Sequence, residues 1–356
     1  MKRSGKLDQQ IAQAIIKACD EILDGNLRDQ FIVDAIQGGA GTSANMNANE
    51  VIANRAIEIL GGTKGDYSIV HPNDHVNMSQ STNDVIPTAG KITVLKLLPQ
   101  TIKELEKLEK AMEEKEAEFD DILKMGRTQL QDAVPMRLGQ SFGAFAHVLK
   151  RDIKRLKNVM DEMKVLNIGA TAIGTAINVD PYYLANISYE LSKVAGISLK
   201  QADDLIDATQ NLDGFVSVSG VLKTCAVGIS KISNDLRLMS SGPRTGLSEI
   251  NLPARQNGSS IMPGKINPVI PEVVSQVAYL IIGHDYTITM AAEAGQCEEY
   301  IEKSVGISTA LCPYIGYAKS AEIAKKSLKT GISVKELVLE EGLLKEEELK
   351  GSKQEK

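Results

Sequence analysis

The sequence contains no tryptophan, and its five phenylalanines and nine tyrosines make up only 4% of its 356 residues. A core without large aromatic side chains must be built from Leu, Ile, Val, Ala and Met, which suits helices that pack on helices. The chain is long enough for two or three domains and a large buried core. The shortage of aromatic residues therefore favours a mainly α-helical protein.

Cysteine is scarce as well. The four cysteines (Cys19, Cys225, Cys297 and Cys312) form no CxxC pair, and the four histidines do not fall at metal-ligand spacing. This pattern argues against a disulfide framework and against a zinc site. Unpaired, reduced thiols are typical of a cytoplasmic protein, so we predict that location and no protein-bound metal.

Basic clusters and long apolar runs are also missing. The formal net charge is −6 and no block of lysines or arginines occurs, which disfavours a nucleic-acid partner. The start of the chain is not an apolar leader. The most apolar stretch, residues 269–292, is interrupted by Gln276, His284 and Asp285, so it resembles a helix buried on all sides rather than a membrane span.

Apolar residues at helical spacing dominate the remaining sequence. They predict helices at about residues 7–22, 98–112, 142–166, 218–239 and 269–292. Most of these segments are longer than the roughly 11–12 residues of an ordinary helix, which indicates a bundle. The last two have little polar surface left for water, so we expect them to be buried between subunits of a homo-oligomer as well as within one chain.

The segments between these helices are rich in Gly, Ser, Thr, Asn and Pro, at residues 36–50, 61–90, 125–140, 167–182 and 240–268. They exceed the usual bundle connection, and long ordered loops tend to carry function. Three of them contain clusters of amides and hydroxyls suited to binding a carboxylate: GTSANMNANE (41–50), QSTND (80–84) and GSSIMPGKIN (258–267). Each cluster alone also fits a simpler role, either a helix cap or a flexible linker bearing a solvated lysine.

Taken together, the motifs resemble the fumarase/aspartase superfamily. GSSIMPGKINPVIPE is highly specific for it, and GTSANMNANEVIANRA, HPNDHVNMSQSTNDVIPTA, GRTQLQDAVPMRLGQ and MAAEAGQ follow the order found in that family. The resemblance implies a mainly α fold, with a long-helix central bundle between small N- and C-terminal domains. We place the boundaries at 1–82 for the remainder of the N-terminal domain, 83–296 for the bundle and 297–356 for the C-terminal helical domain.

The resemblance also implies a chemistry: elimination of ammonia from L-aspartate to give fumarate, through an enediolate. It assigns Ser259 as the base, acting as an alkoxide, and it assigns the substrate-binding side chains Thr42, Ser81, Thr82, Asn83, Thr128, Gln129, Ser260, Lys265 and Asn267. No organic cofactor is implied, although Mg²⁺ activates some members. The implied assembly is a homotetramer in which three subunits build each active site.

Gln129 discriminates between two members of the superfamily. Fumarate hydratases typically carry a histidine at this position of GRTQLQDAVP, in a charged pair thought to handle water. A glutamine cannot exchange a proton in that way, so we predict an ammonia-lyase, with fumarate hydratase as the alternative.

The chain departs from the family in two places. Several dozen residues that normally precede the position of Met1 are missing, and MAAEAGQ runs directly into Cys297 instead of into a long bundle helix. Loss of a core helix would expose apolar neighbours at a cost of about 25 cal/mol per Å². A non-catalytic homologue that serves as a scaffold or binding protein is therefore a third hypothesis.

Overall fold

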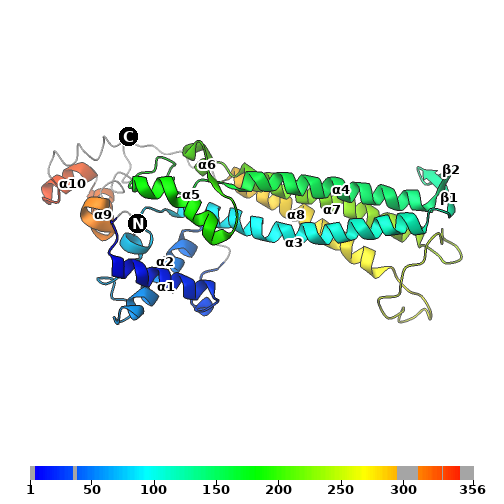
Figure 1. Ribbon diagram of the computed structural model, residues 1–356, viewed down its shortest axis with the longest axis horizontal. Coiled ribbons are helices and arrows are strands. Elements are labelled where there is room, and N and C mark those ends of the chain that lie inside the picture. The colour runs from blue at the N-terminus through cyan, green and yellow to red at the C-terminus, as the bar shows by residue number, and fades with distance from the viewer. Residues whose placement is uncertain (1–4, 35–37, 295–311, 331, 345–356) are drawn as a thin grey trace. The chain divides into compact units, whose positions relative to one another are not determined.

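The computed structural model describes residues 5–34, 38–294, 312–330 and 332–344, and it is mainly helical (Figure 1), as predicted. The chain divides into two compact units. Unit 1 comprises residues 1–90, 166–211 and 296–356, and unit 2 comprises residues 91–165 and 212–295. Residues 166–211, which the sequence assigns to the bundle, therefore cluster with the N-terminal residues. The three consecutive domains stay a prediction.

Unit 1 is built from short helices. They are α1 (Gln9–Leu23), η1 (Arg28–Gln30), α2 (Thr42–Ile59), η2 (Pro72–Val76), the start of α3 (Thr82–Glu118), α5 (Pro181–Ala195), α6 (Leu205–Gln210), α9 (Cys312–Thr330) and α10 (Val334–Glu340). A short strand pair, β3 (Val165–Leu166) with β4 (Lys200–Gln201), lies between α4 and α6 in the chain order. The capping box predicted at residues 333–336 opens α10, because Ser333 and Glu336 bond each other's backbone N–H.

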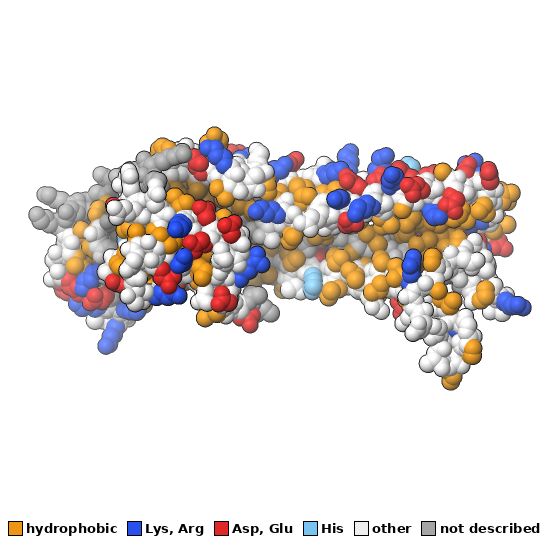
Figure 2. Space-filling view, turned by 60° about the horizontal axis from the view of Figure 1, so that its bottom comes forward, with side chains coloured by type: hydrophobic (Ala, Val, Ile, Leu, Met, Phe, Trp, Pro, Cys, Tyr) orange, Lys and Arg blue, Asp and Glu red, His pale blue; other side chains and the backbone are white. Residues whose placement is uncertain are grey.

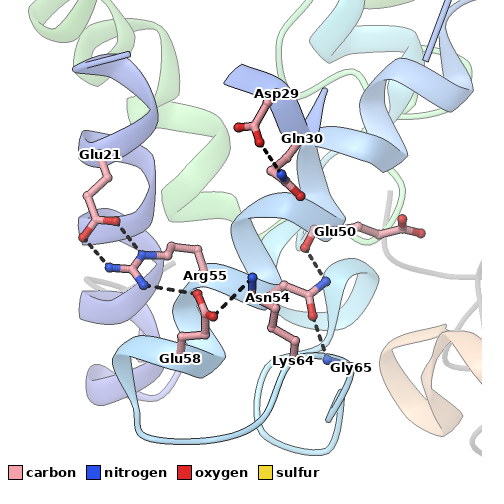
Figure 3. Close-up of polar contacts among 9 residues, drawn as sticks. All are labelled: Glu21, Asp29, Gln30, Glu50, Asn54, Arg55, Glu58, Lys64 and Gly65. Atoms are coloured by element: carbon pink, nitrogen blue, oxygen red, sulfur yellow. Dashed lines mark hydrogen bonds and ion pairs between the residues drawn. The ribbon is translucent and has the colours of Figure 1, made fainter. Parts of the chain in front are cut away.

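Helices α1 and α2 pack through small apolar residues. Ala14 of α1 joins Ala53, Ala56 and Ile57 of α2 in one buried cluster. Beside this cluster, the Arg55 guanidinium bonds Glu21 of α1 at 2.5 and 3.2 Å and Glu58 of its own helix at 3.1 Å (Figure 3). The two-pronged contact fixes the register of the two helices.

Unit 2 is a bundle of long helices. It contains most of α3, together with α4 (Leu138–Met163), α7 (Asp213–Met239) and α8 (Val269–Glu293). Helix α7 packs on both α4 and α8. Helices α3 and α4 approach closely at Gly139, where a Cβ atom would lie 2.3 Å from the Glu116 carbonyl, so only glycine fits there.

The sequence-based boundaries were wrong where polar side chains are buried or where both strand faces are exposed. Residues 36–50 and 61–90 are not loops throughout, because α2 begins at Thr42 and α3 at Thr82. Asn45 and Asn49 occupy buried positions of α2 where a pattern search expects apolar residues. Residues 125–140 contain the antiparallel hairpin β1 (Leu123–Thr128) and β2 (Gln131–Arg137), whose second strand is almost wholly exposed and shows no alternation.

Helix α8 is only partly buried within the single chain, and its predicted burial between subunits stays a prediction. It is not buried on all sides, because Ile270, Val273, Val277 and Leu280 are each about half exposed. Figure 2 shows hydrophobic side chains gathered in a band along the bundle. Among the described helices, α7 alone is long and apolar enough to cross a membrane, a property that it shares with core helices of bundles, and it packs on α4 and α8.

Candidate active site

The predicted base, Ser259, lies in a short turn ahead of α8. Its backbone N–H donates to the Lys265 carbonyl at 3.1 Å, and the Lys265 N–H donates to the Met262 carbonyl at 3.2 Å. Gly264 closes the turn with a φ of +80°, a conformation that favours glycine. The turn therefore has a defined shape although most of its side chains are exposed.

The oxygen of Ser259 is surrounded by backbone donors. The N–H groups of Ile261 and Met262 point at its Oγ from 3.3 and 3.1 Å. Such donors stabilise negative charge on an oxygen. In the described part of the chain only the N–H groups contact the oxygen, and the Lys265 side chain is exposed, as are Ser260 and Asn267.

Thr128 and Gln129 occupy the tip of the β1–β2 hairpin. Thr128 pairs with Gln131 across the two-residue turn. Both residues of the turn, Gln129 and Leu130, have left-handed backbones with φ of +53° and +62°. Neither is the Asn or Gly that such turns prefer, and strained backbone of this kind often marks functional sites. Both predicted binding side chains are exposed.

Glu249 joins the hairpin to the segment that leads into the Ser259 turn. One of its carboxylate oxygens lies 2.8 Å from Arg127 and the other 3.0 Å from Lys124, both on β1. Its N–H also bonds the carbonyl of Met239 at the end of α7. All three charged side chains are largely shielded from water, so this network is stronger than a surface ion pair.

Unit 1 contains the other four predicted residues, at two neighbouring helix N-termini. Thr42 begins α2, and its hydroxyl donates to the Gly39 carbonyl at 2.7 Å. Asn45, one turn further along α2, donates to the Thr82 hydroxyl at 3.1 Å and thereby ties α2 to the start of α3. The Ser81 Oγ accepts the Asn83 N–H at 3.3 Å, so the helix-cap role proposed for this cluster is present.

The ten predicted residues thus form two sets. Unit 1 brings together Thr42, Ser81, Thr82 and Asn83, and unit 2 carries Thr128, Gln129, Ser259, Ser260, Lys265 and Asn267. The roles assigned to them stay a prediction.

Sequence reasoning missed three features beside these sets: Glu249, the buried Asp84 and the residue 167–172 loop that Asp84 binds. Glu249 and the loop residues lie outside the short motifs we singled out, and Asp84 was considered only as a cap.

Among the described residues, no group of three or more His, Cys, Asp or Glu side chains could hold a metal ion. Cys19 and Cys225 are unpaired thiols. Burial raises the pKa of Cys225 to about 12, and the negative charge of Asp152 adds to that effect.

Comparison with known proteins identifies the family. A family model described as lyase matches residues 1–283, and a second model, described as fumarase C C-terminus, matches residues 307–351. The chain belongs to the fumarase/aspartase superfamily of lyases. The predicted resemblance, the fold class and the prediction of an enzyme are confirmed.

Relatives and solved structures agree on this family. An aspartate ammonia-lyase of Bacillus subtilis is 50% identical, over 97% of this chain and 81% of its own length. One from Escherichia coli is 47% identical, over 96% of this chain and 81% of its own. A crystal structure of a Brucella melitensis fumarate lyase:delta crystallin bound to cobalt gives a TM-score of 0.80 at 47% identity, covering 98% of this chain and 85% of that one. A Schistosoma mansoni class II fumarase gives 0.79 at 31% identity, with the same coverage.

The chain is shorter than its relatives inside the matched stretch. The Bacillus subtilis alignment spans 386 positions, whereas 97% of this superfamily member's 356 residues is about 345. About 40 of the aligned positions therefore have no residue in this chain. The two family models leave residues 284–306 unmatched, the interval in which the sequence predicts a deletion.

Proposed function

We propose that this lyase eliminates ammonia from L-aspartate to give fumarate, with Ser259 as the base. The observation that carries the proposal is the pair of backbone N–H groups, from Ile261 and Met262, on the Ser259 oxygen. A serine hydroxyl is a weak base unless its anion is stabilised. Two fixed donors lower the free energy of the alkoxide without a neighbouring histidine.

The proton to be removed lies on the carbon next to the side-chain carboxylate of L-aspartate. Its removal converts that carboxylate into a doubly charged enediolate, and catalysis depends on donors placed where this charge develops. Lys265, Asn267 and Ser260 supply an ammonium, an amide and a hydroxyl within nine residues of the base. The second negative charge then collapses to form the double bond as ammonia leaves.

The remaining predicted residues complete the proposed pocket. Thr42, Ser81, Thr82 and Asn83 provide hydroxyl and amide groups at two helix N-termini, where free N–H groups favour a carboxylate. Thr128 and Gln129 bring a hydroxyl and an amide on the hairpin tip. These side chains would hold the second carboxylate and the amino group, and closure of the Ser259 turn over the substrate would exclude water.

Ammonia rather than water is the proposed leaving group because position 129 is glutamine, which cannot take part in acid–base chemistry. The relatives at 47–50% identity described above carry the name aspartate ammonia-lyase. Fumarate hydratase is the second candidate, and the likeness to a class II fumarase supports it. No organic cofactor enters this chemistry, and Mg²⁺ would act only as an activator.

Self-association is part of the proposal. The exposed residues Ile270, Val273, Val277 and Leu280 of α8 recur at helical spacing, and an apolar stripe of this kind is typical of a subunit interface. We infer a homotetramer in which such faces meet. The unpaired thiols of Cys19 and Cys225 support a cytoplasmic location.

Ultraviolet absorbance of fumarate tests the proposed reaction. Purified protein is mixed with L-aspartate and, in parallel, with L-malate. The proposal predicts fumarate from L-aspartate together with an equal amount of ammonia. Fumarate from L-malate alone would establish the hydratase, and fumarate from neither would favour the non-catalytic scaffold.

A further inference from the structure

Asp84 is a fully buried carboxylate at the start of α3. In the described part of the chain its partners are backbone N–H groups and it has no cation. One oxygen accepts from Ser81 at 3.0 Å, and the other accepts from Gly169 at 3.1 Å and from Thr171 at 3.0 Å. Burial raises the pKa of Asp84, and these donors act in the opposite direction.

A helix cap does not require this arrangement. Asp84 is the third residue of α3 and accepts the N–H of Ser81, a capping-box contact that a neutral glutamine also makes, and a buried carboxylate costs free energy unless it is fully bonded. What aspartate adds is a second oxygen without hydrogens. That oxygen accepts two N–H groups from a loop more than eighty residues away in sequence.

The loop that Asp84 holds has a strained backbone. Thr171 has a φ of +59°, which is rare for a β-branched residue. Its side chain is buried and its hydroxyl has no partner. The bond from its N–H to Asp84 therefore helps to keep Thr171 in a conformation that it would not adopt in a free loop.

The next residue determines how Asn83 is oriented. The Asn83 amide nitrogen donates to the Ala172 carbonyl at 2.6 Å. The backbone carbonyl of Asn83 in turn accepts a hydrogen bond from the side-chain amide of Asn167 at 2.9 Å. A carbonyl oxygen only accepts hydrogen bonds, so the amide nitrogen of Asn83 must face Ala172. Its Oδ1 is then directed away from the loop on an exposed residue.

We propose that Asp84 is a positioning residue for Asn83. Asp84 fixes the residue 167–172 loop and so holds the Asn83 side-chain amide with its oxygen outward. This position then offers a hydrogen-bond acceptor to the substrate. The only hydrogen-bond donor of L-aspartate at neutral pH is its ammonium group, because both carboxylates are ionised. Asp84 thus sets the preference for an amino substrate, an inference that rests on the proposed function.

A binding experiment in the Ser259→Ala background separates this effect from turnover. Calorimetry compares L-aspartate with succinate, which has the same two carboxylates and no ammonium group. We expect Asp84→Asn to weaken L-aspartate binding roughly tenfold or more, because a hydrogen bond to a charged group is lost, and to change succinate binding little. Asp152→Asn, which alters an equally buried carboxylate in unit 2, is the control and should leave the ratio of the two affinities unchanged.

A double-mutant cycle tests whether Asp84 acts through Asn83. Asn83→Ala alone should lower the L-aspartate affinity selectively, and adding Asp84→Asn should then have no further effect on the ratio. Additive effects, or equal losses for both ligands, would overturn the proposal. If the Ser259→Ala parent itself binds L-aspartate no better than succinate, the proposal that this position accepts the ammonium group is overturned, whereas the proposed function fails only if the unsubstituted protein forms no fumarate from L-aspartate.

A second variant serves if Asp84→Asn does not fold. Thr171→Gly keeps the N–H group and tolerates a positive φ, but it frees the backbone that aims the Ala172 carbonyl. The same selective loss, smaller in size, is expected. An unchanged ratio in this variant would contradict the role of the loop.

Discussion

The carboxylate of Glu249 lies 2.8 Å from the guanidinium of Arg127, the residue directly before Thr128. With its second oxygen 3.0 Å from Lys124, Glu249 holds the hairpin against the segment that leads to Ser259. Two stretches that carry predicted site residues are therefore anchored to one acid within unit 2.

Replacing Glu249 tests this anchor. Glu249→Gln keeps the size of the side chain but removes its charge, so both cations lose their partner. We expect kcat with L-aspartate to fall about tenfold or more, since misplacement of site residues by a fraction of an ångström is costly. Glu58→Gln is the matched control, because Glu58 also contacts two cations, Arg55 and Lys64 (Figure 3). Equal effects of the two variants on kcat would contradict the role given to Glu249.

Lys265 is predicted to bind a substrate carboxylate. Lys265→Met keeps the length of the side chain without its charge, and the side chain is exposed, so folding should be unaffected. Both KM and kcat should worsen, with kcat/KM lower by about a hundredfold, because the lost ion pair is present in the ground state and grows stronger as the carboxylate becomes the doubly charged enediolate. Steady-state kinetics with L-aspartate measures both constants. A KM unchanged from that of the parent would argue against carboxylate binding.

Asp285 contributes a pH-dependent link between α7 and α8. Lys223 at 2.5 Å and Ser219 at 2.8 Å bond its carboxylate and lower its pKa. A carboxyl with a lowered pKa stabilises the fold above its unfolded value of about 3.9, and this stability is lost as the pH falls through the folded pKa.

Asp285→Asn should therefore cost about 1–3 kcal/mol near neutral pH. The difference from the parent protein should shrink below about pH 4. Urea unfolding at several pH values measures it. Glu104→Gln, which breaks an exposed pair with Lys107, is the control and should change little. A pH-independent difference for Asp285→Asn would show that the ionised carboxylate is not the stabilising species.

The apolar stripe of α8 is predicted to form a subunit interface. Val277→Lys places a charge in its middle, on a side chain that is 51% exposed in the single chain, so the monomer should still fold. Light scattering after gel filtration should show the tetramer reduced to smaller species. Lys110→Glu, on the solvated surface of α3, is the control. A tetramer that persists in Val277→Lys would place the interface elsewhere.

Local patterns in the sequence predicted the long helices well. The predicted segments around residues 142–166, 218–239 and 269–292 match α4, α7 and α8 to within a few residues, because their apolar periodicity is strong. Helix α2 was missed because Asn45 and Asn49 fill buried positions. The exposed hairpin gave no alternating pattern.

The motifs located the Ser259 turn, but they could not reveal which groups contact its oxygen. The N–H groups of Ile261 and Met262 reach that oxygen only through the folded turn. In the same way, Asp84 and Thr171 are 87 residues apart, and their hydrogen bond is a product of the tertiary fold. No local pattern in a single sequence reports such a contact.

Turnover of L-aspartate by Ser259→Ala, measured beside Thr245→Ala, tests whether Ser259 is the base. Both substitutions remove a hydroxyl from the same connecting segment, but only Ser259 carries the two N–H donors on its oxygen. We predict that Ser259→Ala loses fumarate formation by about 10²–10⁴-fold while still binding succinate, and that Thr245→Ala matches the parent. Fumarate formation by Ser259→Ala within about threefold of the parent, a change of well under 1 kcal/mol in the barrier, would contradict the assignment of Ser259 as the base.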